Sequence, residues 1–242
     1  MLPTAISDRR FETAETGPIA GVKNWIAARS RHWRADLFFR TLDPDPDESV
    51  LDLGGGRGRH IARFYSRLRN VWIADFNEDA LGFARDSFGY KTILLDGTRT
   101  LPIADGQFDV IFCSSVIEHV TGPKEAAVAR FKADGAAFRR EAFEYQKGFA
   151  DELRRCSKRY FVQTPARYFP VEVHSWIPLL GYLRSDLQWQ VIRVFNLFWP
   201  RKNQSPDWSL LTYRQMAALF PDAEIHREIV LGITKSYIAI RR

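Results

Sequence analysis

Four glycines and an aspartate follow a short apolar run in the stretch SVLDLGGGRGRHIARF, which spans residues 49–64. Glycine has no Cβ atom and tolerates positive φ angles, so this loop can turn sharply and bring its backbone close to a ligand. The carboxylate of Asp52 stands directly before the loop, where it suits a cationic or amino group. The spacing therefore predicts a loop that binds a small ligand.

Two common nucleotide-binding loops do not fit this spacing. A triphosphate loop of the GxxxxGK type needs a lysine after its last glycine, and none follows here. A dinucleotide loop needs GxGxxG, but its third glycine would fall at Arg59 or Ile61. The sequence has instead an acidic residue followed by GxGxG, formed by Asp52, Gly54, Gly56 and Gly58.

Further residues that can do chemistry stand where predicted strands end. They are Asp75, Asp96, Cys113 and Ser114, followed by His119 in SSVIEHV and His174 in VEVHSW. The carboxyl ends of parallel strands share one edge of a sheet, where ligands of open α/β folds bind. Histidine is the side chain whose intrinsic pKa best suits proton transfer near neutral pH. We expect His174, and next to it His119, to act as the base or to orient an acceptor.

Strand and helix patterns alternate along most of the chain. Apolar runs predict strands at 49–53, 71–75, 91–96, 108–114, 159–165, 223–230 and 235–242. Helical spacing predicts helices at 21–42, after the first strand to about residue 68, at 77–89, at 124–157 with a break at 134–135, and at 212–220. This alternation predicts an α/β fold whose sheet is mostly parallel, with helices on both faces. The last two strands are too close for a crossover, which predicts an antiparallel C-terminal hairpin.

The composition of the 242 residues is that of a globular chain, with 45% hydrophobic and 14% aromatic residues. Two cysteines without metal-ligand spacing indicate a reducing compartment, and we expect no metal. No leader and no long apolar run is present, so a cytoplasmic protein is expected. The net charge of +6 falls mostly on predicted helices, and without a nucleic-acid module we expect no specific nucleic-acid partner.

Four stretches in order resemble the motifs of class I S-adenosylmethionine-dependent methyltransferases. The stretches are LDLGGGRGRH, VWIADFNEDAL, ILLDGTRTLPIADGQFDVIFCSSVIEHV and RRCSKRYFVQTPARYFP. The chain is most similar to the small-molecule methyltransferases of the quinone-biosynthesis and natural-product type. The resemblance implies a Rossmann-like seven-stranded sheet. It also implies S-adenosylmethionine as cofactor, with S-adenosylhomocysteine as product.

The resemblance also implies roles for single residues. Asp52 would lie below the methionine amino group, and the backbone at Gly54, Gly56 and Gly58 would approach that part of the cofactor. Asp75 would accept both ribose hydroxyls, with Phe76 against the adenine.

Asp96 would accept from the adenine amino group, and Gly97 would line the ring edge. Cys113 and Ser114 would contact the methionine portion.

Residues 166–205 are too long and too apolar for a simple connection after the fifth strand. The favoured interpretation is a helical, aromatic-rich cap over an acceptor pocket. The N-terminal segment and helix at 1–45 would contribute to it, beside a cofactor-binding catalytic domain at 46–242. Two interpretations stay open. The segment could lie on a membrane surface, with Arg184, Arg193, Arg201 and Lys202 near lipid, or form a homodimer interface.

The resemblance implies methyl transfer to an apolar or aromatic small molecule, at oxygen in preference to nitrogen. Carbon stays open as the acceptor atom. An RNA or lipid-linked substrate is an alternative, although no NPPY-type motif follows the fourth strand, where the chain has CSSVIEH. A non-catalytic subunit that retains the cofactor fold is a further alternative.

Overall fold

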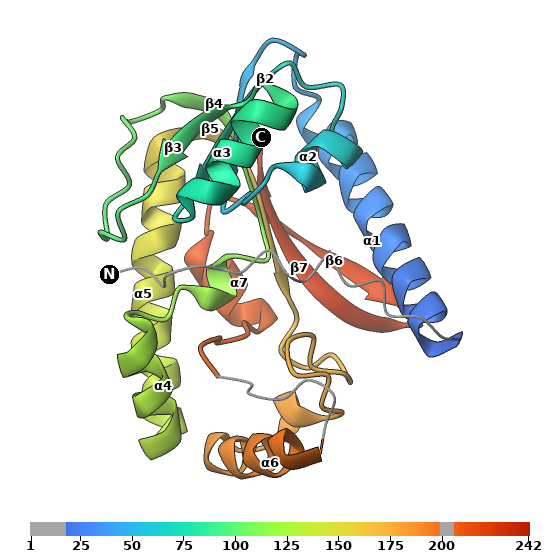
Figure 1. Ribbon diagram of the computed structural model, residues 1–242, viewed down its shortest axis with the longest axis vertical. Coiled ribbons are helices and arrows are strands. Elements are labelled where there is room, and N and C mark those ends of the chain that lie inside the picture. The colour runs from blue at the N-terminus through green and yellow to red at the C-terminus, as the bar shows by residue number, and fades with distance from the viewer. Residues whose placement is uncertain (1–17, 199–205) are drawn as a thin grey trace.

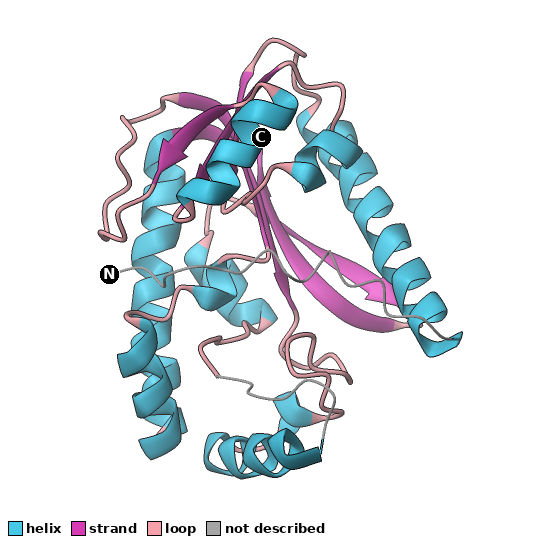
Figure 2. Ribbon diagram, viewed as in Figure 1, coloured by secondary structure: helices cyan, strands magenta, loops and turns pink. Residues whose placement is uncertain are grey.

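A seven-stranded sheet in the order β3-β2-β1-β4-β5-β7-β6 separates two layers of helices (Figures 1 and 2). The computed structural model describes residues 18–198 and 206–242. The parallel strands are β1 (Ser49–Leu53), β2 (Asn70–Asp75), β3 (Lys91–Leu94), β4 (Phe108–Ser114) and β5 (Ser157–Pro165). β6 (Glu224–Val230) and β7 (Ile233–Arg241) pair antiparallel, and β7 also pairs antiparallel with β5. The predicted Rossmann-like sheet and its C-terminal hairpin are confirmed.

The strand order reverses between β1 and β4. From β1 the chain moves outward to β2 and β3, and it then returns to place β4 on the other side of β1. The connections that leave such neighbouring strands diverge, and a crevice opens outside their carboxyl ends. The glycine loop follows β1, and the stretch with His119 follows β4. The topology therefore directs both segments to one edge of the sheet.

One face of the sheet is covered by α1 (Pro18–Leu42), α2 (Arg59–Phe64) and α3 (Glu78–Phe88). Phe38 of α1 is fully buried, and its ring packs edge-on against those of Tyr65, Phe112 and Phe161. α1 therefore shares a core with the sheet. The contribution of residues 1–45 to a cap stays a prediction, and residues 1–17 lie outside the described part of the chain.

The other face is covered by α5 (Gly135–Cys156) and α7 (Tyr213–Leu219). α5 buries an apolar stripe that includes Phe149 and Leu153, which lie one helical turn apart. Its N-terminus is capped by Asp134, whose side chain accepts from the backbone N–H groups of Ala136 and Ala137. This cap separates α4 (Lys124–Ala133) from α5, at the break that the sequence predicts.

A third group of buried residues lies beyond the carboxyl ends of the strands, where α4, the first half of α5 and α6 (Ser185–Phe198) meet (Figure 1). Its members are Ala127, Phe131, Phe138, Ala142, Ile177, Leu180 and Ile192. We call these helices the outer helical unit. The insertion after β5 is helical, as predicted, and its partner is the segment after β4. Arg201 and Lys202 lie outside the described residues.

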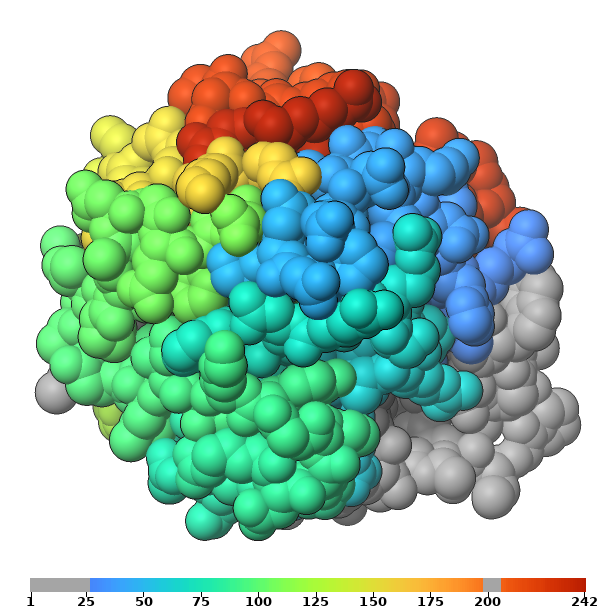
Figure 3. Space-filling view, turned by 90° about the horizontal axis from the view of Figure 1, so that it is seen from above, coloured from blue at the N-terminus to red at the C-terminus, as the bar shows by residue number. Residues whose placement is uncertain are grey.

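Segments far apart in the sequence close the opposite end of the sheet, where the parallel strands begin (Figure 3). Arg159 donates to the carbonyl of Leu42 at 2.8 Å and pairs with Glu48. Arg241 donates to the carbonyl of Lys158 at 3.1 Å. These contacts tie β5 to the segment before β1 and to β7.

No helix in the described part of the chain combines the length and apolar character that crossing a membrane requires.

Candidate functional site

The glycine loop after β1 adopts a conformation that requires glycine. Gly54, Gly56 and Gly58 have φ angles of 78°, 52° and 69°. A Cβ atom at Gly54 would lie 2.5 Å from Cγ2 of Val116, which belongs to the segment after β4. The loop therefore packs directly against the segment that leads to His119.

Asp52 is buried under this loop with one oxygen unsatisfied. Its side chain is 3% exposed, and Oδ2 has no hydrogen-bond partner among the described residues. Burial, and then the charge of Asp75, raise the pKa of Asp52 to about 8. A buried carboxylate without a partner is unfavourable, and a ligand that brings a cation removes the penalty. The residue thus fits the amino group of the expected cofactor.

Asp75 ends β2 and is tied to both neighbouring segments. Its Oδ2 accepts from the backbone N–H of Gly56 at 2.9 Å, and its Oδ1 accepts from that of Asn77 at 3.0 Å. The side chain of Asn77 in turn caps α3 by accepting from Ala80. Each carboxylate oxygen has a further lone pair, so the pair of oxygens suits a vicinal diol. Phe76 lies next to it and is partly buried.

Asp96 lies just after β3 and is exposed. Its Oδ1 accepts from the backbone N–H of Thr98 at 2.9 Å and from the Thr98 hydroxyl at 2.7 Å. These hydrogen bonds lower the pKa of Asp96. Gly97 is buried and has a φ angle of 80°. The adenine contacts of both residues stay predictions.

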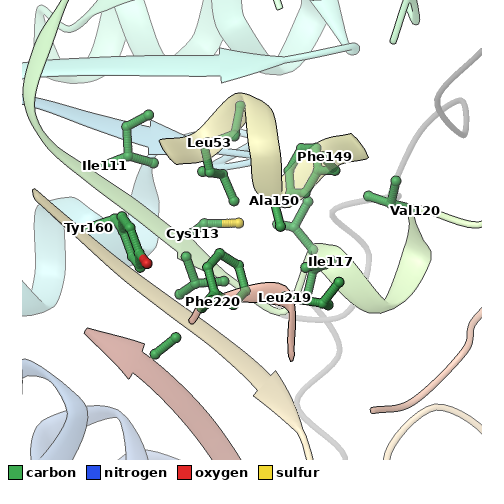
Figure 4. Close-up of a cluster of buried hydrophobic side chains, with 14 of the residues drawn as sticks. Leu53, Ile111, Cys113, Ile117, Val120, Phe149, Ala150, Tyr160, Leu219 and Phe220 are labelled. Atoms are coloured by element: carbon green, nitrogen blue, oxygen red, sulfur yellow. The ribbon is translucent and has the colours of Figure 1, made fainter. Parts of the chain in front are cut away.

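The side chains at the end of β4 are already engaged. The thiol of Cys113 lies in the apolar cluster with Leu53, Ile117 and Phe149 (Figure 4), and burial raises its pKa. A thiol contact with the cofactor would require this cluster to open, so the role expected of Cys113 is limited to its backbone. The hydroxyl of Ser114 donates to Gln163 at 2.7 Å.

The structure brings the two predicted catalytic histidines together. The rings of His119 and His174 meet edge to face, with 4.8 Å between their centroids. Nδ1 of His174 lies 2.7 Å from Oε1 of Glu172, and Nε2 lies 3.9 Å from Oε1 of Glu118. All four side chains are buried. We call these four residues the histidine cluster.

Residues from three further segments hold this cluster in place. Gln146, fully buried on α5, donates to the carbonyls of Ile117 at 3.1 Å and Ser209 at 2.9 Å. Thr164 of β5 donates to Oε2 of Glu118 at 3.0 Å. Trp208 stacks on His174 at 4.9 Å.

The sequence pattern by itself does not mark Gln146, Thr164, Glu172 or Trp208 as part of a site. The spacing of an acid two residues before His174 was the one local signal.

Glu172 is ionised in this setting. Burial raises its pKa, but the charge of His174 and the hydrogen bonds from His174 and Ser175 outweigh burial, and the pKa is lowered. The backbone N–H groups of His174 and Ser175 donate to its two oxygens at 3.0 and 2.6 Å. The carboxylate is therefore held in one orientation behind the imidazole.

A cavity of about 30 Å³ lies under the outer helical unit, next to the histidine cluster. Glu172 and Trp208 contribute to its wall, together with Arg139 and Arg167. Burial, and then the charge of Arg167, lower the pKa of Arg139 to about 10. The guanidinium group of Arg139 thus stays charged at neutral pH.

The remaining histidines serve packing or lie elsewhere. His60 stacks on Phe112 at 5.9 Å, and burial lowers its pKa to about 3. His226 of β6 lies 3.4 Å from Glu224, on the edge strand.

Comparison with known proteins agrees with this geometry. The sequence pattern of a family described as a methyltransferase domain matches residues 50–133. The ubiquinone/menaquinone biosynthesis C-methyltransferase UbiE of Vibrio campbellii is 31% identical over 125 residues, 48% of this chain and 48% of that protein. The mitochondrial ubiquinone biosynthesis O-methyltransferase of Saccharomyces cerevisiae is 35% identical over 92 residues, 35% of this chain and 29% of that protein. The chain thus spans about half or less of the length of these relatives.

A solved structure shows the same fold. Magnesium protoporphyrin IX methyltransferase from Synechocystis, solved with bound S-adenosylhomocysteine, covers 97% of this chain with 92% of its own length. Its TM-score is 0.52 at 13% sequence identity, which establishes a common fold and no more. The glycine loop, the acids at the ends of β1 and β2, and the sheet order agree with the family match. Residues 50–133 thus match the methyltransferase-domain family, and the fold of the chain is the Rossmann-like fold of class I S-adenosylmethionine-dependent methyltransferases.

Proposed function

We propose that this chain transfers a methyl group from S-adenosylmethionine to an oxygen atom of a small-molecule acceptor. The observation that carries the proposal is the unsatisfied carboxylate of Asp52 under a glycine loop that packs on the segment leading to His119. Cofactor site and acceptor site are then neighbours across the contact between Gly54 and Val116.

The cofactor would be held by residues from three strand ends. Asp52 would pair with the methionine amino group, and Asp75 would accept from the ribose hydroxyls while keeping its bonds to Gly56 and Asn77. Phe76 would pack on the adenine, with Asp96 and Gly97 at its edge. When bound, S-adenosylmethionine would supply the methyl group of its sulfonium. Transfer to the acceptor oxygen would leave S-adenosylhomocysteine and a methyl ether, and an imidazole of the histidine cluster would take up the hydroxyl proton.

The chain's own contribution to this transfer is alignment and exclusion of water, which account for much of the barrier reduction in such displacements. His119 and His174 would contact the acceptor hydroxyl from the end of β4 and from the loop after β5. The outer helical unit would cover the acceptor.

The names of the relatives include a C-methyltransferase and an O-methyltransferase, both of quinone biosynthesis. An oxygen acceptor usually needs a group that removes or offsets its proton. The histidine cluster offers such groups, and this favours oxygen. An aromatic acceptor fits the stacked Trp208, and an anionic group on it would fit the cavity wall that contains Arg139 and Arg167.

Two measurements test the proposal. Thermal unfolding with S-adenosylhomocysteine at about 100 times its dissociation constant should add about 2.7 kcal/mol of stability. For a domain of this size, the midpoint of thermal unfolding then rises by roughly 2–4 °C for each kcal/mol. The protein is also incubated with S-adenosylmethionine and a panel of phenols, carboxylic acids and amines. We expect S-adenosylhomocysteine to form when the acceptor is a phenol.

The proposal would be excluded if S-adenosylhomocysteine did not raise the unfolding midpoint of protein that mass spectrometry finds free of cofactor. A shift with NADH alone would do the same. Turnover with amines and with no phenol would move the acceptor from oxygen to nitrogen.

A lipid-linked acceptor is a second candidate, and the surface of α6 favours it. Leu187, Val194 and Leu197 are 43%, 48% and 76% exposed and recur at helical spacing along one side. Arg184 and Arg193 on the same segment are exposed too. Such a surface suits contact with an anionic membrane.

Co-sedimentation with anionic phospholipid vesicles distinguishes the two candidates. Under the lipid hypothesis the wild-type chain should sediment with the vesicles, and Leu197→Asp should reduce the bound fraction. The matched control is Ile229→Asp on β6, because Ile229 is 61% exposed and lies outside α6. Equal sedimentation of all three proteins would reject the lipid-linked acceptor.

A further inference from the structure

We propose that Glu118, His119 and His174 bind a divalent transition-metal cation such as Zn²⁺. One ligand atom from each residue lies within 4.8 Å of the other two, and all three side chains are buried. Two imidazoles with one carboxylate form a donor set typical of catalytic zinc, in which a fourth position stays open. The described residues contain no second group of this kind.

The orientation of His174 supports this assignment independently of the donor count. Its Nδ1 lies 2.7 Å from Oε1 of Glu172, so this nitrogen carries the proton and donates it to the carboxylate. In the neutral form of the ring, which a metal requires, Nε2 presents a lone pair on the side where Oε1 of Glu118 lies, 3.9 Å away. A carboxylate behind the imidazole is the arrangement that orients most metal-binding histidines.

The separations suit a cation after small side-chain rotations. Ligand atoms about 2.0–2.2 Å from a tetrahedral metal are about 3.3–3.6 Å apart. The distance of 3.9 Å between Nε2 of His174 and Oε1 of Glu118 is close to that range. Closing the widest separation, 4.8 Å, requires movements of roughly 1 Å. Gln146 and Thr164 already hold the segment that carries Glu118.

The burial of the donors also suits a metal cation. Glu118 and Glu172 are both almost fully buried, and they lie next to the imidazole of His174. Buried charged groups in proteins are paired or coordinate a metal.

A cation here would have a role in catalysis, and this part of the inference rests on the proposed function. The segment with Glu118 and His119 begins at Val116, which packs on Gly54 of the cofactor loop. A Lewis acid beside the methyl donor would bind the acceptor oxygen and lower the pKa of its hydroxyl. Acceptors with an ionisable hydroxyl, such as phenols, would then need no separate base.

Cobalt titration tests the site without using activity. The full chain, purified without a histidine tag and treated with a chelator, is titrated with Co²⁺ and followed by visible absorption. We expect bands of a four- or five-coordinate site that saturate at one cation per chain and are displaced by Zn²⁺. Calorimetry with Zn²⁺ provides the affinity.

Variants locate the site within the chain. His174→Ala and Glu118→Gln should abolish the bands, and Glu172→Gln should weaken binding roughly 10–100-fold because it orients His174. The matched control is His226→Ala, because His226 also lies beside a glutamate, 3.4 Å away on β6. It should bind as the wild type does. Binding of S-adenosylhomocysteine by each variant reports whether it is folded.

The outcomes separate this inference from the proposed function. Wild-type chain that binds S-adenosylhomocysteine but neither cation would overturn the metal site and leave the methyltransferase proposal standing. Cation binding that persists in both His174→Ala and Glu118→Gln would also overturn it. Cation binding without any binding of S-adenosylhomocysteine would support the metal site and contradict the proposed function.

Discussion

Oδ2 of Asp75 accepts a hydrogen bond from the backbone N–H of Gly56 at 2.9 Å. The carboxylate that ends β2 is thereby joined to the loop that follows β1, although 19 residues separate the two. Its other oxygen accepts from Asn77 at the start of α3. One side chain thus sets the position of the glycine loop, of α3 and of the expected ribose site.

Asp75→Ala should weaken binding of S-adenosylhomocysteine by at least about 100-fold. Each hydrogen bond to a charged group contributes about 1.5–3 kcal/mol, and the ribose diol would lose two of them. Calorimetric titration measures the effect. The control is Asp79→Ala, which removes an exposed carboxylate from the first turn of α3 and should leave the affinity within about twofold. Equal affinities for both variants would contradict the ribose assignment.

Affinity for S-adenosylhomocysteine should rise with pH up to about 8, because the pKa of Asp52 is raised to about 8. Only the ionised carboxylate attracts the ligand's amino group, which keeps its proton below roughly pH 8. Affinity should therefore increase by up to about tenfold per pH unit between about pH 6 and the pKa. Calorimetry across this range measures it. Asp52→Asn should bind more weakly and show a flatter profile.

The same shift has the opposite effect on the ligand-free protein. An acid whose pKa is raised on folding binds its proton more tightly in the folded state. Stability is therefore lost as pH rises from about 4 to the folded pKa of about 8. Urea unfolding measures the free energy of unfolding at about pH 6 and about pH 8. Between these two values, the stability of Asp52→Asn relative to the wild type should increase by on the order of 2 kcal/mol. A constant difference between the two proteins would refute the raised pKa.

Gly54→Ala should destabilise the fold and weaken cofactor binding. The new Cβ would sit at a φ angle of 78° and 2.5 Å from Cγ2 of Val116. The backbone cost is about 1–2 kcal/mol, and the steric clash adds to it. Gly89→Ala is the matched control, since its φ is 69° and nothing lies within 4 Å of the added atom. Urea unfolding should show a larger loss for Gly54→Ala, and adding Val116→Ala should recover part of the difference.

Arg34→Met should destabilise the attachment of α1 to the sheet by about 2–3 kcal/mol, because it leaves a buried carboxylate with less compensation. Nε of Arg34 lies 3.7 Å from Oε2 of Glu228, and Lys235 lies 3.1 Å from the other oxygen. Burial raises the pKa of Glu228, but the charges of Arg34 and Lys235 outweigh burial, and the net effect is a lowered pKa. The stability from this group is therefore present above about pH 4.5 and is lost as pH falls through the folded pKa.

Urea unfolding checks this prediction against an exposed pair. Arg69→Met removes the partner of Asp47 at 3.9 Å, where both side chains are about three-quarters exposed, and should cost less than about 1 kcal/mol. Replacing Glu228 by Gln in the Arg34→Met background should restore part of the loss. Equal losses for the two single variants would mean that burial of Glu228 does not matter.

The local sequence was sufficient to predict the parts of this protein that depend on neighbours in the chain. Each strand in the described residues lies at a stretch that the local apolar pattern predicts. The start of α5 at Asp134 and the end of α3 at Gly89 follow from helix capping, which involves residues within one turn. The acid and glycines around β1 are likewise a local pattern, because turn geometry and close approach to a ligand depend on adjacent residues.

The tertiary structure alone decided which distant side chains meet. Glu118 and His174 approach each other because β4 and β5 end side by side, and Gln146 and Trp208 enclose them from other segments. The burial of the Cys113 thiol and the packing of α6 on α4 and α5 are of the same kind. Such contacts arise when elements far apart in the chain bury apolar surface against one another. Which elements pack together leaves no local pattern in the sequence.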